Sequence, residues 1–196
     1  LRPAPRCSLW IEVKNSLFNM KLVNHQQNPP RALNNLKFKM PQDNLEKLAH
    51  SYCKLLNSID WSDEIIVNGL KEGINKFLSN ASIYLNKGSK YEQGDFYSPA
   101  ALSKINNKHN DIIYEHMILK NKYIQQPCIK RCQSSKSGMN FEFAYRLISK
   151  YWKIAIITKE EDAKLRQCGL RNAMPENWDG NNIFSRYEAA GIQLIS

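Results

Sequence analysis

The spacing of apolar residues over positions 42–86 is that of two amphipathic helices. Apolar side chains recur every three or four positions over 45–59 and again over 66–78, which is the period of one helix face. Asp43 is expected to cap the first helix. The second is expected to begin at Ser62, because two acidic residues follow where the helix dipole favours anions. The pattern therefore predicts a helical hairpin.

The second half of the chain mixes strand and helix patterns. Short apolar runs at 111–118 and 154–157 are typical of strands, and the second run is of the kind that fills a buried strand. Thr158 and Glu161 have the spacing of a capping box, which predicts a helix through residue 167. Further helices are expected at 98–106, 140–152 and 183–190. The whole pattern predicts a helix-rich α+β fold with a small sheet in the C-terminal half.

Positive charge adds most to this picture. The 196 residues include 28 Lys and Arg against 18 Asp and Glu, a net charge of +10. Residues 1–40 hold seven basic residues against Glu12 alone, and residues 119–153 hold eight against Glu142 alone. The second group comprises Lys120, Lys122, Lys130, Arg131, Lys136, Arg146, Lys150 and Lys153. Because phosphates bound by such groups release counterions, the expected partner is nucleic acid, DNA or RNA.

Composition and proline positions suggest how the chain is divided. A chain of this length predicts one folded core. Residues 1–41 are expected to form an irregular basic arm, because prolines interrupt them before the first helix. Residues 42–196 are expected to form a single α+β domain, in which 42–86 is the helical hairpin and 96–196 carries the nucleic-acid-binding surface.

Several classes of protein are excluded or disfavoured. No apolar run approaches the roughly 18 residues of a membrane span, and the basic segment lacks the apolar face of an interfacial helix, so no membrane partner is expected. The odd number of cysteines, five, favours free thiols and a cytoplasmic location. Cys128 and Cys132 are spaced CxxxC, which favours two thiols on neighbouring helical turns over a zinc site.

One short segment suggests chemistry. Histidine can take a proton from water near neutral pH, and His116 is the best candidate for a general base. Residues 114–120, Tyr-Glu-His-Met-Ile-Leu-Lys, resemble the first element of the ββα-metal (HNH, or His-Me finger) nucleases, in which an acidic residue and a histidine end a strand. The resemblance implies that His116 activates the attacking water and that Glu115 helps to hold a divalent metal, Mg²⁺ or Mn²⁺.

The segment departs from the family in two respects. Leu119 stands where proline is usual, and no histidine follows His116, so an asparagine would have to complete the metal site. The asparagines considered for this role are Asn140, Asn172, Asn181 and Asn182. Adjacent residues of a strand point to opposite faces, so Glu115 and His116 would meet only at a strand end or a bulge.

Other features leave alternatives open. Residues 9–14 contain a Glu-x-Lys pattern that resembles the PD-(D/E)XK nucleases, but no aspartate precedes Asp43. The C-terminal third resembles the closing region of bacterial proteins of unassigned activity. Its acidic group at 160–162 either caps a helix or holds metal. Trp178 and Tyr187 either stack on bases or anchor the last helix.

The sequence thus predicts a nucleic-acid-binding protein whose expected activity is metal-dependent hydrolysis of phosphodiester bonds with His116 as general base. The first alternative is a non-catalytic nucleic-acid-binding module that uses the same surface. The second is a helical protein-interaction domain whose positive charge is incidental.

Overall fold

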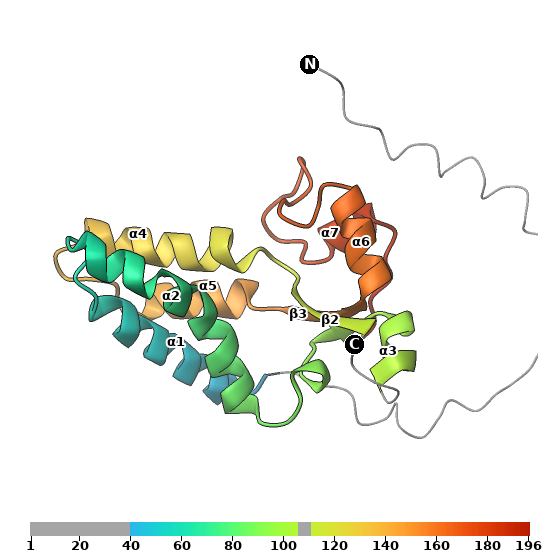
Figure 1. Cartoon of the computed structure of the whole chain (residues 1–196), viewed down its shortest axis with the longest axis horizontal. Coiled ribbons are helices and arrows are strands. Elements are labelled where there is room, and N and C mark those ends of the chain that lie inside the picture. The colour runs from blue at the N-terminus through green and yellow to red at the C-terminus, as the bar shows by residue number, and fades with distance from the viewer. Residues whose placement is uncertain (1–39, 106–110) are drawn as a thin grey trace, which may run out of the picture. The chain divides into compact units, whose positions relative to one another are not determined.

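Helices surround a small sheet in this protein (Figure 1). The computed structural model describes residues 40–105 and 111–196. The predicted helix-rich α+β class is confirmed. Most of the predicted basic arm, the Glu-x-Lys segment at 9–14 and His109 lie outside the described residues.

The elements follow one another in a simple order. They are α1 (Gln42–Asn57), α2 (Glu64–Asn86), β1 (Phe96–Tyr97), α3 (Pro99–Ile105), β2 (Ile112–His116), α4 (Gln126–Ser134), α5 (Phe141–Tyr151), β3 (Ile154–Thr158), α6 (Lys159–Gln167) and α7 (Ser185–Ala189). A 3-10 turn lies at Lys90–Glu92, and a π-helical turn at Asn121–Gln125 leads into α4.

The helical hairpin predicted over 42–86 is present, with different helix starts. Pro41 occupies the N-cap position of α1, so Asp43 lies in the first turn and does not cap the helix. Ser62 is held in the preceding turn, where its N–H and its hydroxyl both donate to Asp60. The cap of α2 is instead Asp63, whose carboxylate accepts two backbone N–H groups of the first turn.

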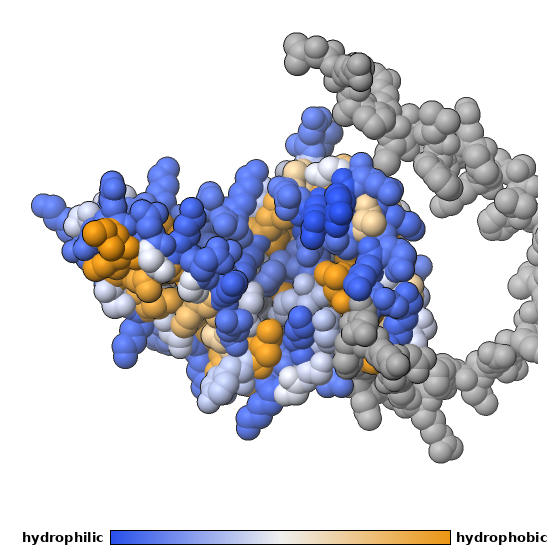
Figure 2. Space-filling view, in the orientation of Figure 1, coloured by the Kyte–Doolittle hydropathy of each residue, from blue (hydrophilic) through white to orange (hydrophobic). Residues whose placement is uncertain are grey.

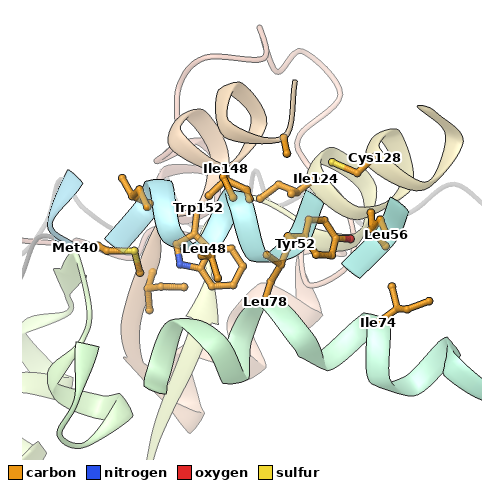
Figure 3. Close-up of a cluster of buried hydrophobic side chains, with 14 of the residues drawn as sticks. Met40, Leu48, Tyr52, Leu56, Ile74, Leu78, Ile124, Cys128, Ile148 and Trp152 are labelled. Carbon is orange, nitrogen blue, oxygen red and sulfur yellow. The ribbon is translucent and has the colours of Figure 1, made fainter. Parts of the chain in front are cut away.

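The hairpin is one part of a larger helical bundle. Figure 3 shows α1 lying between α2 on one side and α4 and α5 on the other. The buried residues of α1 include Leu48, Tyr52 and Leu56, each fully buried. They share a cluster, named here the bundle core, with Ile74, Leu78, Ile124, Cys128, Ile148 and Trp152. Cys128 and Cys132 lie on neighbouring turns of α4, as the CxxxC spacing predicts, and both are buried.

The sheet is built on one buried strand. β3 is central, with β1 parallel to it and β2 antiparallel, and all five of its residues are buried. Ile154 and Ile156 point into the bundle core, whereas Ala155 and Ile157 point into a second cluster, named here the C-terminal core, with Met117, Leu165, Leu170, Tyr187 and Ile192. Each face of the sheet thus closes a different core.

The capping box predicted at the start of α6 is confirmed. Thr158 accepts from the Glu161 N–H at 3.2 Å, and Glu161 accepts from the Thr158 N–H at 2.8 Å. Asp162 forms ion pairs with Arg166 and Arg171. The acidic group at 160–162 is therefore occupied in capping and ion pairing.

One end of the bundle exposes apolar side chains. Ile65 is 85% exposed, and Ile66 and Leu70 are each 41% exposed; Figure 2 shows hydrophobic surface at the end where α2 begins. In the described ranges, no helix has both the length and the apolar character needed to span a bilayer.

Candidate nucleic-acid interface

Strand β2 carries Glu115 and His116 to opposite faces of the sheet. The strand pairs regularly with β3, with Glu115 opposite Ala155 and His116 opposite Ile154, so no bulge brings the two side chains together. Glu115 lies on the face of the C-terminal core, and His116 lies against Trp152 of the bundle core. The two predicted site residues therefore do not face a common site.

Glu115 is engaged by a buried arginine. Its Oε1 lies 2.9 Å from a terminal nitrogen of Arg186, whose side chain is fully buried. The guanidinium also donates to four backbone carbonyls, which belong to Leu170, His116, Met117 and Arg171. Burial raises the pKa of Glu115, and the Arg186 charge opposes that shift. This carboxylate joins β2 to the C-terminal segment, a role that differs from metal binding.

His116 is half-buried and lies between two aromatic rings. Its ring centroid lies 4.7 Å from that of Trp152 and 5.8 Å from that of Tyr114. Burial, followed by the charges of Lys120 and Arg186, lowers the pKa of His116 to about 3. The imidazole is therefore neutral at pH 7, and a group with so low a pKa is a weak general base at that pH.

The polar contact of His116 is Ser79, on α2. The His116 Nε2 lies 3.2 Å from Ser79 Oγ, and the Lys120 ammonium donates to the same oxygen at 3.1 Å and to the Asn75 carbonyl at 2.6 Å. Burial lowers the pKa of Lys120. This predicted phosphate-binding lysine is half-buried and ties the segment after β2 to α2.

No set of metal ligands forms around Glu115. Within 40–105 and 111–196, no group of three or more His, Cys, Asp or Glu side chains is arranged to hold a metal ion. Asn140 caps α5 by accepting from the Phe143 N–H, and Asn182 accepts from the Phe184 N–H and donates to Glu188. The nuclease mechanism stays a prediction from the sequence.

The remaining basic residues are arranged differently from Lys120. Six of them are exposed on the π-helical turn, α4, α5 and the loop between these helices, and are named here the α4–α5 face: Lys122, Lys130, Arg131, Lys136, Arg146 and Lys150. Lys153 is half-buried beyond the end of α5. Among the described residues, none of these seven forms an ion pair with a carboxylate.

A surface pocket lies between α4 and α5, which run beside each other in Figure 1. It has a volume of about 230 Å³ and is lined by Arg131 of α4 and by Asn140, Glu142, Phe143 and Arg146 at the start of α5. The Arg146 guanidinium lies over the Phe143 ring, 5.4 Å from its centroid. Two guanidinium groups beside one pocket suit a phosphate, since each guanidinium can donate two parallel hydrogen bonds to phosphate oxygens.

The turn between α4 and α5 is fixed from α1. The Asn57 side chain donates to the Met139 carbonyl and accepts from the Met139 N–H, both at 2.8 Å. Gly138 has φ +73°, and a Cβ there would lie 2.5 Å from the Asn57 Oδ1. Only glycine fits this position without a shift, so the two helices that line the pocket have a defined connection.

Some residues with important contacts were not predicted, because the sequence pattern indicates them weakly or not at all. Arg186 and Ser79 are far along the chain from the strand that they contact. Tyr123 and Tyr151 each follow a lysine of the basic segment, and this pairing of cation and aromatic residue was the available signal. Of the two aromatic residues singled out, Tyr187 is buried in the C-terminal core and Trp178 is half-buried.

Comparison with known proteins yields no matching family model, no matching curated protein and no matching solved structure. The function therefore has to be inferred from the geometry described above.

Proposed function

We propose that this protein binds nucleic acid through the α4–α5 face. The observation that carries the proposal is a group of exposed cations for which no described carboxylate serves as partner. An exposed cation without an acid partner keeps its attraction for phosphate, and each phosphate that it neutralises releases counterions. Arg131 and Arg146 line one pocket together with Glu142 and would offer a phosphate two guanidinium groups.

The surroundings of Glu115 and His116 favour binding of nucleic acid over its cleavage. Glu115 is paired with Arg186, and His116 is a neutral, half-buried ring packed against Trp152 on the other face of β2. The binding surface requires neither residue, so the proposal stands apart from the predicted nuclease chemistry.

The direct test removes cations from the face and compares the loss with an equal loss elsewhere. The full chain carrying Arg131→Ala, Arg146→Ala and Lys150→Ala is titrated with fluorescein-labelled oligonucleotides, and anisotropy gives the Kd over a range of salt concentrations. The control carries Lys47→Ala, Lys54→Ala and Lys71→Ala, three exposed lysines on α1 and α2, so both variants have the same net charge.

We expect the first variant to bind at least about tenfold more weakly near 0.1 M salt, and its salt slope to fall by about 2 to 3. The control should lose much less affinity. Equal losses in the two variants would show that only overall charge matters. If the unmodified protein binds no oligonucleotide, the positive charge is incidental, as in the second alternative.

Cleavage is tested separately. Oligonucleotide or plasmid is incubated with the protein and Mg²⁺ or Mn²⁺, and the products are compared with those of His116→Ala. Metal-dependent cleavage that His116→Ala abolishes supports the nuclease prediction. Cleavage that survives the substitution contradicts the role given to His116.

A further inference from the structure

Three aromatic rings from separate segments meet at one end of the α4–α5 face. Tyr123 lies in the π-helical turn before α4, Tyr151 ends α5, and Trp178 lies in the loop before α7. The centroid distances are 4.9 Å between Tyr123 and Trp178, 5.8 Å between Tyr123 and Tyr151, and 6.3 Å between Tyr151 and Trp178. These residues are named here the aromatic cluster.

The aromatic cluster is not sealed inside the protein. All three side chains are half-buried, and Tyr123 and Trp178 belong to neither of the two hydrophobic cores of the described chain. Each of these aromatic residues therefore keeps part of its surface open to solvent, where a ligand can reach it.

The indole of Trp178 has a fixed orientation. Its Nε1 donates to the Asn182 carbonyl at 2.7 Å. The loop between these residues is closed by Asp179, whose carboxylate accepts the N–H groups of Asn181 and Asn182 at 2.7 and 2.9 Å. A ring held in this way loses little conformational freedom when a ligand stacks on it.

Two cations of the α4–α5 face lie beside the aromatic cluster. The Lys122 ammonium lies 5.5 Å from the centroid of Tyr123, and that of Lys150 lies 5.0 Å from the centroid of Tyr151. Each tyrosine of the aromatic cluster thus has a positive charge next to it. Aromatic surface for bases beside cations for phosphates is the combination found in proteins that bind single strands.

We propose that the aromatic cluster binds unstacked bases, so that the nucleic acid taken by the α4–α5 face is single-stranded. This inference rests on the function proposed above. In a duplex both faces of each base are covered by its neighbours, whereas the bases of a single strand can leave the stack and lie on protein rings. The strand would place bases on the aromatic cluster and a phosphate at the Arg131 and Arg146 pocket.

The dimensions of the face agree with this arrangement. Tyr123 and Arg131 are eight residues apart on nearly continuous helix, which corresponds to about 12 Å at a rise of about 1.5 Å per residue. A stacked strand rises about 3.4 Å along its axis per nucleotide, and an unstacked strand spans more per nucleotide, so no more than about four nucleotides are needed to cover the distance. A short oligonucleotide is therefore a sufficient probe.

The experiment compares strandedness and aromatic substitutions in one set of titrations. The full chain is titrated with labelled oligothymidylate, with oligouridylate of the same length and with a DNA duplex of that length. The variants are Trp178→Ala, Tyr151→Ala and Trp178→Phe. The matched control is Tyr84→Ala, which removes a tyrosine that is 84% exposed on α2. A thermal melt of each variant reports whether it folds.

We expect both single strands to bind more tightly than the duplex. Trp178→Ala and Tyr151→Ala should each weaken single-strand binding by about tenfold, since each removes a ring on which a base stacks, and should leave duplex binding within about twofold. Trp178→Phe should keep most of the affinity, because a ring remains for stacking. It should also lose the tryptophan quenching that the single strand causes in the unmodified protein.

Two results would overturn the inference in different ways. If single strands and duplex bind equally, and the aromatic variants match Tyr84→Ala, the stacking role is wrong while nucleic-acid binding stands. If neither probe binds the unmodified protein, the proposed function fails and this inference fails with it. Should Trp178→Ala unfold, Tyr151→Ala and Trp178→Phe still decide between these outcomes. A preference between the oligothymidylate and the oligouridylate shows which of these two strands the aromatic cluster binds more tightly.

Discussion

The charged residues around β2 and those of the α4–α5 face have opposite surroundings. At β2, the Arg186 guanidinium contacts Glu115 and four carbonyls, and the Lys120 ammonium contacts two oxygens of α2. On the α4–α5 face, Arg131 and Arg146 line a pocket and have no ion pair with a described carboxylate. A charge with partners inside the protein is part of the fold, whereas an exposed charge without an ion pair is available to a ligand.

The largest expected effect comes from removing Arg186. Arg186→Met leaves Glu115 without its partner and four backbone carbonyls without a donor. Breaking a buried pair in this way costs about 3–5 kcal/mol in the free energy of unfolding. Urea denaturation measures the loss.

Arg171→Met is the matched control for Arg186→Met. Arg171 is 49% exposed and pairs with Asp162, which retains Arg166, so the expected loss is below about 1 kcal/mol. Equal losses in the two variants would contradict the structural role given to Arg186 and would reopen the question of what Glu115 does.

A second prediction concerns the pH dependence of stability at β2. The pKa of His116 is lowered from 6.5 to about 3, so the unfolded chain binds a proton between these values that the folded chain does not. Stability from this group is therefore complete above pH 6.5 and is lost as the pH falls. From pH 7 to pH 5 the expected loss is about 2 kcal/mol.

Denaturation at several pH values isolates the His116 contribution. His116→Asn should show a weaker dependence over this range. The difference from the unmodified protein is the quantity to compare, since the neighbouring Glu115 also has a shifted pKa. His50→Asn is the control, because it replaces a second histidine, which is exposed on α1 and stacks on the Phe141 ring. An unchanged slope in His116→Asn would show that the imidazole is exposed to water in solution.

Local signals in the sequence account for much of the fold. Thr158 and Glu161 lie three residues apart, so their capping box can be recognised from a single short segment of the sequence. Ser98 caps α3 by accepting from the Ala101 N–H, as its place before a proline predicts. The uninterrupted apolar run at 154–157 predicts strand β3, because such a run is typical of a buried strand.

The candidate site was less predictable because its partners are distant in sequence. Glu115 and Arg186 are 71 residues apart, and Ser79 is 37 residues from His116; no period or spacing in the chain reports such contacts. The composition of the 119–153 segment did indicate which part of the chain carries the exposed basic residues of the α4–α5 face. It could not separate Lys120, which bonds to α2, from Lys150, which is exposed, because that distinction depends on packing.

The most specific prediction uses this pair of lysines. Lys120→Met removes two hydrogen bonds to α2, each of which contributes about 1 kcal/mol, or somewhat more because the donor is charged. It should lower the melting temperature and leave the salt dependence of oligonucleotide binding unchanged.

Lys150→Met should leave the melting temperature unchanged and weaken the salt dependence of oligonucleotide binding. Its ammonium is exposed beside the Tyr151 ring, so its loss should reduce the slope of log K against log salt by about 0.9 if it binds one phosphate. Anisotropy titrations at several salt concentrations, with a melt of each variant, measure both quantities. Lysines in one basic segment would then divide into those that hold the fold and those that hold the ligand, and a slope change in Lys120→Met would remove that division.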